Sequence, residues 1–118
     1  MTGSRTRTGR VGEHFVAYLI EQAGLEASRV DGACDLHVTL RSGRVLRVEV
    51  KTATKVTGHK YKFYCANFEA DVFALVAIND HPLVRFLEEK NMPPYSLHRD
   101  EFTQKKQNAD LQWITNLD

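Results

Sequence analysis

Two segments of alternating apolar and polar residues, 35–40 and 44–51, constrain the fold of this chain more than any other feature. Successive side chains of a strand point to opposite faces of a sheet, so each segment predicts a strand with one apolar face. Gly43 marks a turn between them, which predicts an antiparallel hairpin. A slip of one residue would bury the charged residues, so the pattern selects one register.

The register of this hairpin follows from the length of its connection. A two-residue turn places Leu36 opposite Glu49, which mixes the apolar face with the charged one. A three-residue loop over 41–43 pairs Leu36 with Val48 instead, and it puts Gly43 at the left-handed third position that such loops favour. We therefore predict the three-residue loop.

This register sets two carboxylates, Asp35 and Glu49, opposite each other, and it sets His37 opposite Arg47. Like charges that face each other across strands destabilise a sheet unless something compensates them. A shared divalent cation is one compensation, and carboxylate oxygens suit Mg²⁺ or Mn²⁺. Lys51, on the same face as Glu49, adds a positive charge that can orient a water molecule. The alternative is a surface charge cluster in which Lys51 and Arg47 neutralise the acids.

Apolar residues at helical spacing predict a helix from about Arg10 to Ala23, with Thr8 as its N-cap and Gly24 as its stop. Residues 1–8 are polar and predict a flexible basic arm. The predicted buried stripe consists of Val11, Phe15, Tyr18, Leu19 and Ala23, widened by Val16 and Ile20.

The rest of the chain predicts a loop over Thr52–Lys62, a short edge strand within 25–31 and a short helix near Arg99–Lys106. The stretch 72–78 is apolar on both faces, which is typical of a strand at the centre of a covered sheet. Strands are predicted at Tyr61–Cys65, Val72–Ile78 and Leu83–Leu87.

The composition indicates a single globular domain over residues 1–118, with 42% hydrophobic and 26% charged residues. No apolar run approaches the roughly 20 residues that span a bilayer, so we expect no membrane partner. The two cysteines form no CxxC pair, which excludes a zinc ribbon or disulfide scaffold. Together with the absence of an apolar leader, this predicts a cytoplasmic protein.

Positive charge gathers in the first half of the chain. Residues 1–62 carry eleven Lys/Arg against six Asp/Glu, whereas residues 63–118 carry five against nine. A basic half that also carries the acidic pair favours a polyanionic partner such as nucleic acid. Phosphate contacts and stacking on an opened base are the roles expected for these side chains. The candidate DNA contacts are Arg5, Arg7, Arg10, Lys55, Lys60, Tyr61 and Lys62.

Asp35, followed fourteen residues later by Glu49-Val50-Lys51, resembles the motif of the PD-(D/E)xK nucleases. The upstream Gly9-x-x-x-Glu13 is similar to the glycine-and-glutamate signature of Holliday-junction resolvases of the archaeal and phage type. The resemblance covers roughly residues 8–52. It implies a restriction-endonuclease-like α/β fold, in which a mixed central β-sheet is flanked by helices.

The resemblance also implies Mg²⁺-dependent hydrolysis of a DNA phosphodiester. By position, Asp35 and Glu49 would bind Mg²⁺ together with the backbone carbonyl of Val50, and Mn²⁺ would substitute. Lys51 would position or activate the attacking water. Glu13 would complete the acidic cluster, directly or through a water molecule.

The leading hypothesis is therefore a structure-specific DNA endonuclease that resolves four-way junctions in DNA recombination and repair. Symmetrical cleavage of a junction needs two active sites, which implies a homodimer. Ser28 would contact the scissile phosphate, as a serine does in some resolvases, and such enzymes include phage-encoded ones. The alternatives are a homing or restriction-type site-specific endonuclease on the same fold and a non-catalytic nucleic-acid-binding protein.

Overall fold

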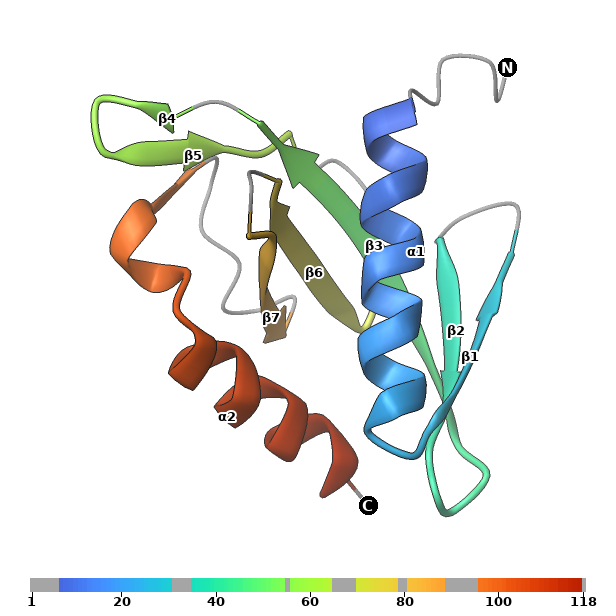
Figure 1. Cartoon of the computed structure of the whole chain (residues 1–118). Helices are drawn as coiled ribbons and strands as arrows, with labels where there is room; N and C mark the ends of the chain where they lie inside the picture. Colours follow the sequence, from blue (N-terminus) through green and yellow to red (C-terminus); the bar gives the residue numbers. More distant parts are fainter. Residues whose placement is uncertain are drawn as a thin grey trace.

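The structure is a computed structural model that describes residues 7–30, 35–54, 56–64, 70–78, 81–88 and 96–117. Within these residues the chain forms a five-stranded mixed sheet, a three-stranded sheet and two α-helices (Figure 1). The elements in chain order are α1 (Arg7–Gln22), β1 (Glu26–Arg29), β2 (Leu36–Thr39), β3 (Val45–Ala53), β4 (Val56–Thr57), β5 (Lys60–Lys62), β6 (Val72–Ala77), β7 (Leu83–Glu88), β8 (Ser96–His98), the 3₁₀ helix η3 (Arg99–Glu101) and α2 (Gln104–Thr115).

The main sheet has the strand order β1-β2-β3-β6-β7, in which β3 and β6 run parallel and the other neighbours run antiparallel. The predicted hairpin register is confirmed, because Leu36 pairs with Val48. Gly43 has the expected left-handed φ of 95° and donates its N–H to the carbonyl of Leu40 at 2.9 Å. The predicted short edge strand is β1. Every residue of β6 is buried, as its apolar sequence predicts.

β3 changes its neighbour half-way along its length. Residues 45–48 pair with β2, whereas residues 48–53 pair with β6 on the other side. Beyond Val48, β3 therefore extends past the first residue of β2, and the two strands form a fork. The fork is the part of the main sheet where backbone groups of β3 face side chains instead of a neighbouring strand.

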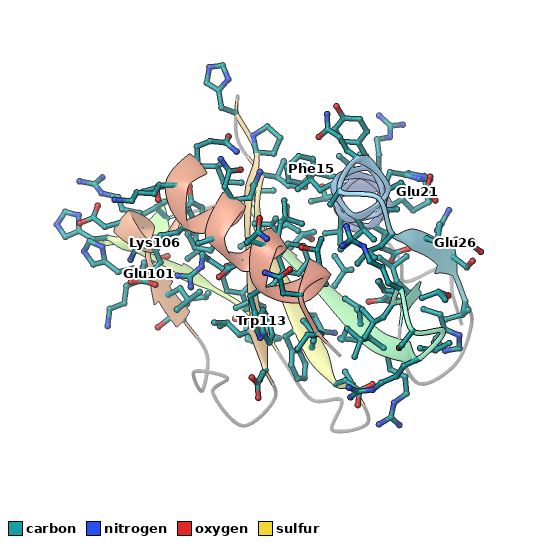
Figure 2. The ribbon with its side chains drawn as sticks, turned by 90° about the horizontal axis from the view of Figure 1, so that it is seen from below. Phe15, Glu21, Glu26, Glu101, Lys106 and Trp113 are labelled. Carbon is teal, nitrogen blue, oxygen red and sulfur yellow. The ribbon has the colours of Figure 1, made fainter. Side chains whose placement is uncertain are left out.

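Both helices cover one face of the main sheet (Figures 1 and 2). One core lies between them and the sheet, with Val16 and Ile20 from α1, Ile114 from α2 and Val48 from β3 among its buried members. Trp113 is partly buried and packs against this core. Each helix thus turns an apolar stripe toward the sheet.

The predicted orientation of the first helix is wrong by part of a turn. Val11 and Tyr18, predicted to be buried, are 47% and 59% exposed. The buried side of α1 carries the predicted Val16, Leu19 and Ile20 together with Gly12 and Glu13, which lay outside the predicted stripe. A polar Glu13 can lie inward because it has an ion-pair partner there, and apolar periodicity does not register such a partner.

The start of α1 also differs from the prediction. Arg7 and Thr8 lie in the helix, so Thr8 is not its N-cap and these two residues are not part of an arm. The remainder of the predicted arm, residues 1–6, lies outside the described residues. The predicted stop is confirmed at Gly24, which has a φ of 95° and donates its N–H to the carbonyl of Glu21.

Gly12 allows α1 to lie directly on β3. A Cβ built on Gly12 would overlap Cγ2 of Thr52 and would lie 3.7 Å from Cγ1 of Val50. Only a residue without a side chain permits this approach, which places the neighbouring Glu13 above the fork.

α2 covers the outer edge of the main sheet. Gln107 accepts the N–H of Val84 at 3.0 Å, and Asp110 accepts the N–H of Phe86 at 2.9 Å, so the helix satisfies backbone donors of edge strand β7. Arg85 joins Asp110 to Glu101, and Lys106 bonds Glu101 at 3.0 Å (Figure 2). The short helix predicted near 99–106 is in fact η3 followed by the longer α2.

The three-stranded sheet replaces the predicted loop over 52–62. β3 continues to Ala53, and β4 and β5 then form a hairpin whose turn contains Gly58, with a φ of 66°. This sheet, of order β4-β5-β8, packs on the main-sheet face opposite the helices. Its core contacts include Tyr61, Phe63, Phe73, Leu75 and Phe102.

We predict that Gly12→Ala destabilises the protein by about 1–3 kcal/mol, because the added methyl group overlaps Thr52. The measurement is the free energy of unfolding in urea. Thr52→Ser removes Cγ2, so the double variant should recover most of the loss. An alanine at position 12 that stabilises the protein, as helix propensity alone predicts, would contradict this packing.

A second pair fastens β6 to β3. Asp71 accepts the backbone N–H of Arg47 at 2.8 Å and its guanidinium at 3.1 Å. Burial raises the pKa of Asp71, but the hydrogen bonds from the Arg47 side chain and backbone outweigh it, so the pKa lies below its usual 3.8.

A carboxylate whose pKa is lowered by folding stabilises the protein above its unfolded pKa and loses that contribution as the pH falls through its folded pKa. We therefore expect Asp71→Asn to lower the free energy of unfolding at pH 7. The difference in unfolding free energy between this variant and the wild type should shrink as the pH falls below 3.8. Urea unfolding across this range is the measurement. A gap that stays constant with pH would exclude the expected linkage.

Candidate functional site

The buried polar side chains of the described residues identify the candidate site. They are Glu13, Asp35, Glu49 and Gln107, which are at most 9% exposed. Gln107 closes the edge of β7. Asp35 accepts the N–H of Val50 at the fork between β2 and β3, Glu49 is the neighbour of Val50 on β3, and Glu13 pairs with Arg29 on the helix side. Burying charged groups is costly unless each one is compensated, so such a concentration indicates function.

Asp35 stands just before the first residue of β2. Its N–H donates to the carbonyl of Val48 at 3.0 Å, although Val48 is the partner of Leu36. Two residues thus oppose one, as in a β-bulge, which redirects a side chain near a sheet edge. The Asp35 carboxylate accepts the N–H of Val50 at 2.8 Å. The predicted direct opposition of Asp35 and Glu49 is corrected accordingly: Asp35 reaches the peptide that joins Glu49 to Val50.

Glu49 and Lys51 lie on the face of β3 that points away from the helices. Their neighbours on β6 are Phe73 and Leu75, which belong to the core on that side. Glu49 is 7% exposed, and its carboxylate lies 3.1 Å from the ammonium group of Lys51. The structure therefore brings Glu49 and Lys51 together on one face, as the alternation predicts, and Asp35 contacts the backbone between them.

The backbone carbonyl of Val50 adds an oxygen to this site. The N–H and C=O of a strand residue point to the same side, and the Val50 N–H points to Asp35. The Val50 carbonyl accordingly faces the β2 side of β3, where β3 has passed the first residue of β2. This direction is compatible with the predicted role of the carbonyl as a Mg²⁺ ligand, which stays a prediction.

Glu13 approaches the same corner from the helix side. It is 4% exposed and pairs with Arg29 at 3.2 Å. Arg29 is opposite Leu36, and the neighbouring Val30 bonds the carbonyl of Asp35, so the pair stands beside the fork. The sequence interpretation missed Arg29. The sequence signal for Arg29 is a basic residue on the strand face that also carries the buried Leu36. A positive charge on that face needs a buried acid as its partner.

The donor set suits a hard divalent cation. Two buried carboxylates and a carbonyl oxygen are the ligand types that Mg²⁺ and Mn²⁺ prefer, and Lys51 is the cation paired with Glu49. No group of three or more His, Cys, Asp or Glu side chains able to hold a metal ion occurs within the described ranges. The structure pairs Glu13 with Arg29, so its predicted role in the metal cluster stays a prediction.

The predicted DNA-contacting residues are dispersed. Arg7 and Arg10 are exposed on α1, and Ser28 is exposed on β1 opposite His37. Arg5 and Lys55 lie outside the described residues. The remaining three, Lys60, Tyr61 and Lys62, form β5.

The predicted role of Tyr61 is corrected. Tyr61 is 7% exposed and packs edge-on against Phe102, with ring centroids 5.2 Å apart, so it supports the small sheet rather than stacking on a base. Among the other aromatic residues, Phe63, Phe73 and Phe86 are buried, whereas Tyr64 is 79% exposed.

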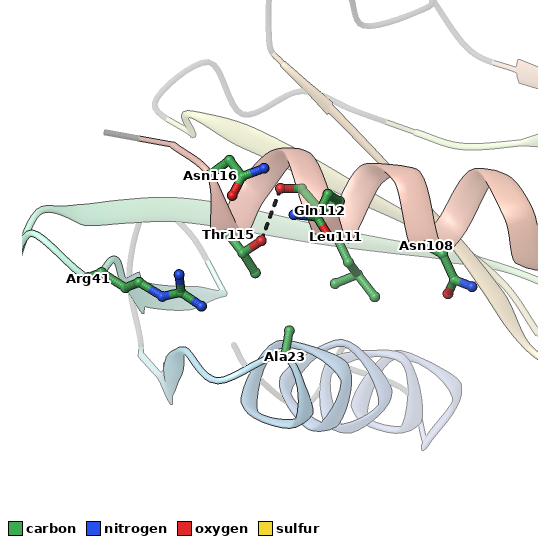
Figure 3. A pocket seen from close by; sticks show the side chains of 7 residues that line it. All are labelled: Ala23, Arg41, Asn108, Leu111, Gln112, Thr115 and Asn116. Carbon is green, nitrogen blue, oxygen red and sulfur yellow. Dashed lines mark hydrogen bonds between the residues drawn. The ribbon is translucent and has the colours of Figure 1, made fainter.

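A separate pocket of about 370 Å³ lies between the end of α1 and α2 (Figure 3). Amide and hydroxyl groups line it with one guanidinium, that of Arg41. The hydroxyl group of Thr115 donates a hydrogen bond to the backbone carbonyl of Gln112 at 3.0 Å. The lining contains no acidic residue, and the pocket is on the helix side, so it is distinct from the carboxylates at the fork.

The fold of this chain is similar to that of a bacterial homing endonuclease, I-Ssp6803I. The two structures superimpose with a TM-score of 0.71 over 92% of this chain and 88% of the other, at 14% sequence identity. No family model matches the sequence, and no curated protein matches it. The similarity establishes a mixed α/β fold shared with an endonuclease. No helix in the described part of the chain is long and apolar enough to cross a membrane.

We predict that the Glu13–Arg29 pair couples α1 to β1. Arg29→Met should destabilise the protein, and the loss should shrink when Glu13→Gln is already present, because the buried charge is then gone. The coupling free energy expected from the double-mutant cycle is about 0.5–3 kcal/mol. Additive effects of the two substitutions in urea unfolding would show that the ion pair contributes nothing to stability.

Proposed function

We propose that this protein is a metal-dependent DNA endonuclease of the homing or restriction type, which cuts duplex DNA at specific sites. The observation that carries the proposal is the geometry at the β2–β3 fork, where Asp35 accepts the N–H of Val50 and the Lys51 ammonium group lies 3.1 Å from Glu49. The similarity of the fold to a homing endonuclease supports it independently of those residues.

The residues divide the proposed chemistry between them. Asp35 and Glu49, with the Val50 carbonyl, would hold Mg²⁺. When bound, this ion would supply Lewis-acid polarisation of the scissile phosphate. The Lys51 ammonium group, 3.1 Å from Glu49, would orient the attacking water and stabilise the negative charge that develops on the phosphate. The ion pair with Arg29 would keep the Glu13 carboxylate beside the fork.

Site-specific duplex cleavage is favoured over junction resolution by the structural similarity. The similar protein is described as a homing endonuclease, and the two chains agree over nearly their whole lengths. Cleavage of both strands of a duplex also needs two active sites, so the proposal includes a homodimer, as junction resolution does.

Cleavage assays with contrasting substrates test the proposal. The purified protein is incubated with Mg²⁺ or with EDTA and with three DNAs: a long genomic duplex, a four-way junction and a single strand. A site-specific enzyme cuts only where its target occurs, so the long duplex should give discrete fragments with Mg²⁺ and none with EDTA. Symmetrical nicks confined to the junction would establish the resolvase instead. Binding without any cleavage would identify a non-catalytic nucleic-acid-binding protein.

Substitutions at the fork test which residues carry the activity. We expect Glu49→Gln and Lys51→Met each to reduce cleavage on the order of a hundredfold or more, because each removes charge that acts on the reacting phosphate. DNA affinity in EDTA should stay near the wild-type value. Glu21→Gln is the matched control, since Glu21 is an exposed glutamate at the far end of α1 and should retain full activity. Wild-type cleavage by Glu49→Gln would place the active site elsewhere.

A further inference from the structure

The outer face of the three-stranded sheet is a polar, basic surface. Direct pairing puts Thr57, Lys60 and His98 on one side of the sheet, and Lys62 joins them two residues along β5. All four are exposed. The opposite side of the same sheet carries Tyr61, which packs on the core.

The charge on this surface has one sign over a long stretch of sequence. Between Glu49 and Glu69 the chain has four lysines and no acidic residue. Among the described residues, the acid nearest in sequence to these four side chains is Asp100, just after β8. Its carboxylate lies 3.4 Å from Nδ1 of His98. The ammonium groups of Lys60 and Lys62 and the hydroxyl group of Thr57 are complementary to a polyphosphate, whereas the imidazole of His98 lies beside Asp100.

The hairpin also has the right size and place. β4 and β5 are two strands of a three-stranded sheet, in which β8 pairs with the other edge of β5. Neighbouring backbones lie about 5 Å apart, so the three strands span about 10 Å, which is less than the width of about 12 Å of the major groove of B-form DNA. The small sheet packs on the same face of the main sheet as Glu49 and Lys51, and β3 leads from those residues into the hairpin. Figure 1 shows β4 and β5 projecting from the top of the molecule, away from the β2–β3 turn.

We propose that the β4–β5 hairpin docks into the major groove of duplex DNA, with Lys60 and Lys62 on the phosphates and Thr57 at its leading end. This inference rests on the proposed function, because the docked duplex is the one that the fork would cut. Burial of Tyr61 against Phe102 holds the ribbon in place from behind. A-form RNA has a narrow major groove that does not admit the ribbon, so duplex RNA should bind less well.

The test is the salt dependence of binding. Affinity for a labelled linear duplex of mixed sequence is measured in EDTA over a range of KCl concentrations. The double variant Lys60→Gln/Lys62→Gln should bind roughly tenfold more weakly. The negative slope of log affinity against log salt should become shallower by about 2, which is about one for each lost phosphate contact. The matched control is Arg41→Gln/Arg44→Gln, which removes two exposed charges from the β2–β3 turn and should keep the wild-type slope.

The groove and the polymer are tested by competition. Methyl green, which occupies the major groove, should displace the wild-type protein, whereas netropsin in the minor groove should not. Duplex RNA should compete poorly. An unchanged salt slope in the double variant, displacement by netropsin alone, or equal binding of duplex RNA would each overturn the inference.

Parallel cleavage assays separate the two proposals. If wild type cuts DNA but the lysine variant keeps its affinity and slope, the hairpin inference fails and the proposed function stands. If wild type never cuts but its binding depends on these lysines, the hairpin inference stands and the proposed function fails. Thermal unfolding of both double variants should match wild type, because all four substituted residues are exposed.

Discussion

The change of neighbour along β3 is the constraint on which the rest of the molecule depends. A strand inside a sheet normally has both edges occupied along its length. β3 instead pairs with β2 before Val48 and with β6 after it. The backbone beyond Val48 therefore needs another partner on the β2 side, and the Asp35 carboxylate provides one at Val50. A polar side chain is thereby built into the sheet itself.

Three buried carboxylates in so small a protein require compensation, and each has a different kind. Glu13 has the guanidinium of Arg29, Asp35 has a backbone N–H, and Glu49 has the ammonium group of Lys51. Each partner is a positive charge or a hydrogen-bond donor, which offsets part of the cost of burying the acid.

The two faces of the main sheet have different coverings. The helices bury the larger core on one face, and α2 also closes the edge at β7. The other face carries the small sheet, together with Glu49 and Lys51. The hairpin that follows β3 is anchored on this second face by an aromatic core.

Short-range patterns were sufficient for β2, β3, β6 and β7 and for the register of the β2–β3 hairpin. The hairpin register, the left-handed Gly43 and the buried β6 follow from alternation and turn chemistry, which act between residues close in sequence. The same alternation brought Glu49 and Lys51 to one face. These features depend on backbone geometry alone, so no knowledge of the remaining fold was needed to predict them.

Long-range packing decided the rest. The rotation of α1 depends on Gly12 meeting Thr52 and on Glu13 meeting Arg29, and these contacts join residues far apart in sequence. The hairpin in residues 56–62 forms because β8 pairs with it from nearly forty residues away. Local polarity indicated a loop there. A short strand with one solvated face, paired with a strand far away in the sequence, has too weak a local sequence pattern to be predicted.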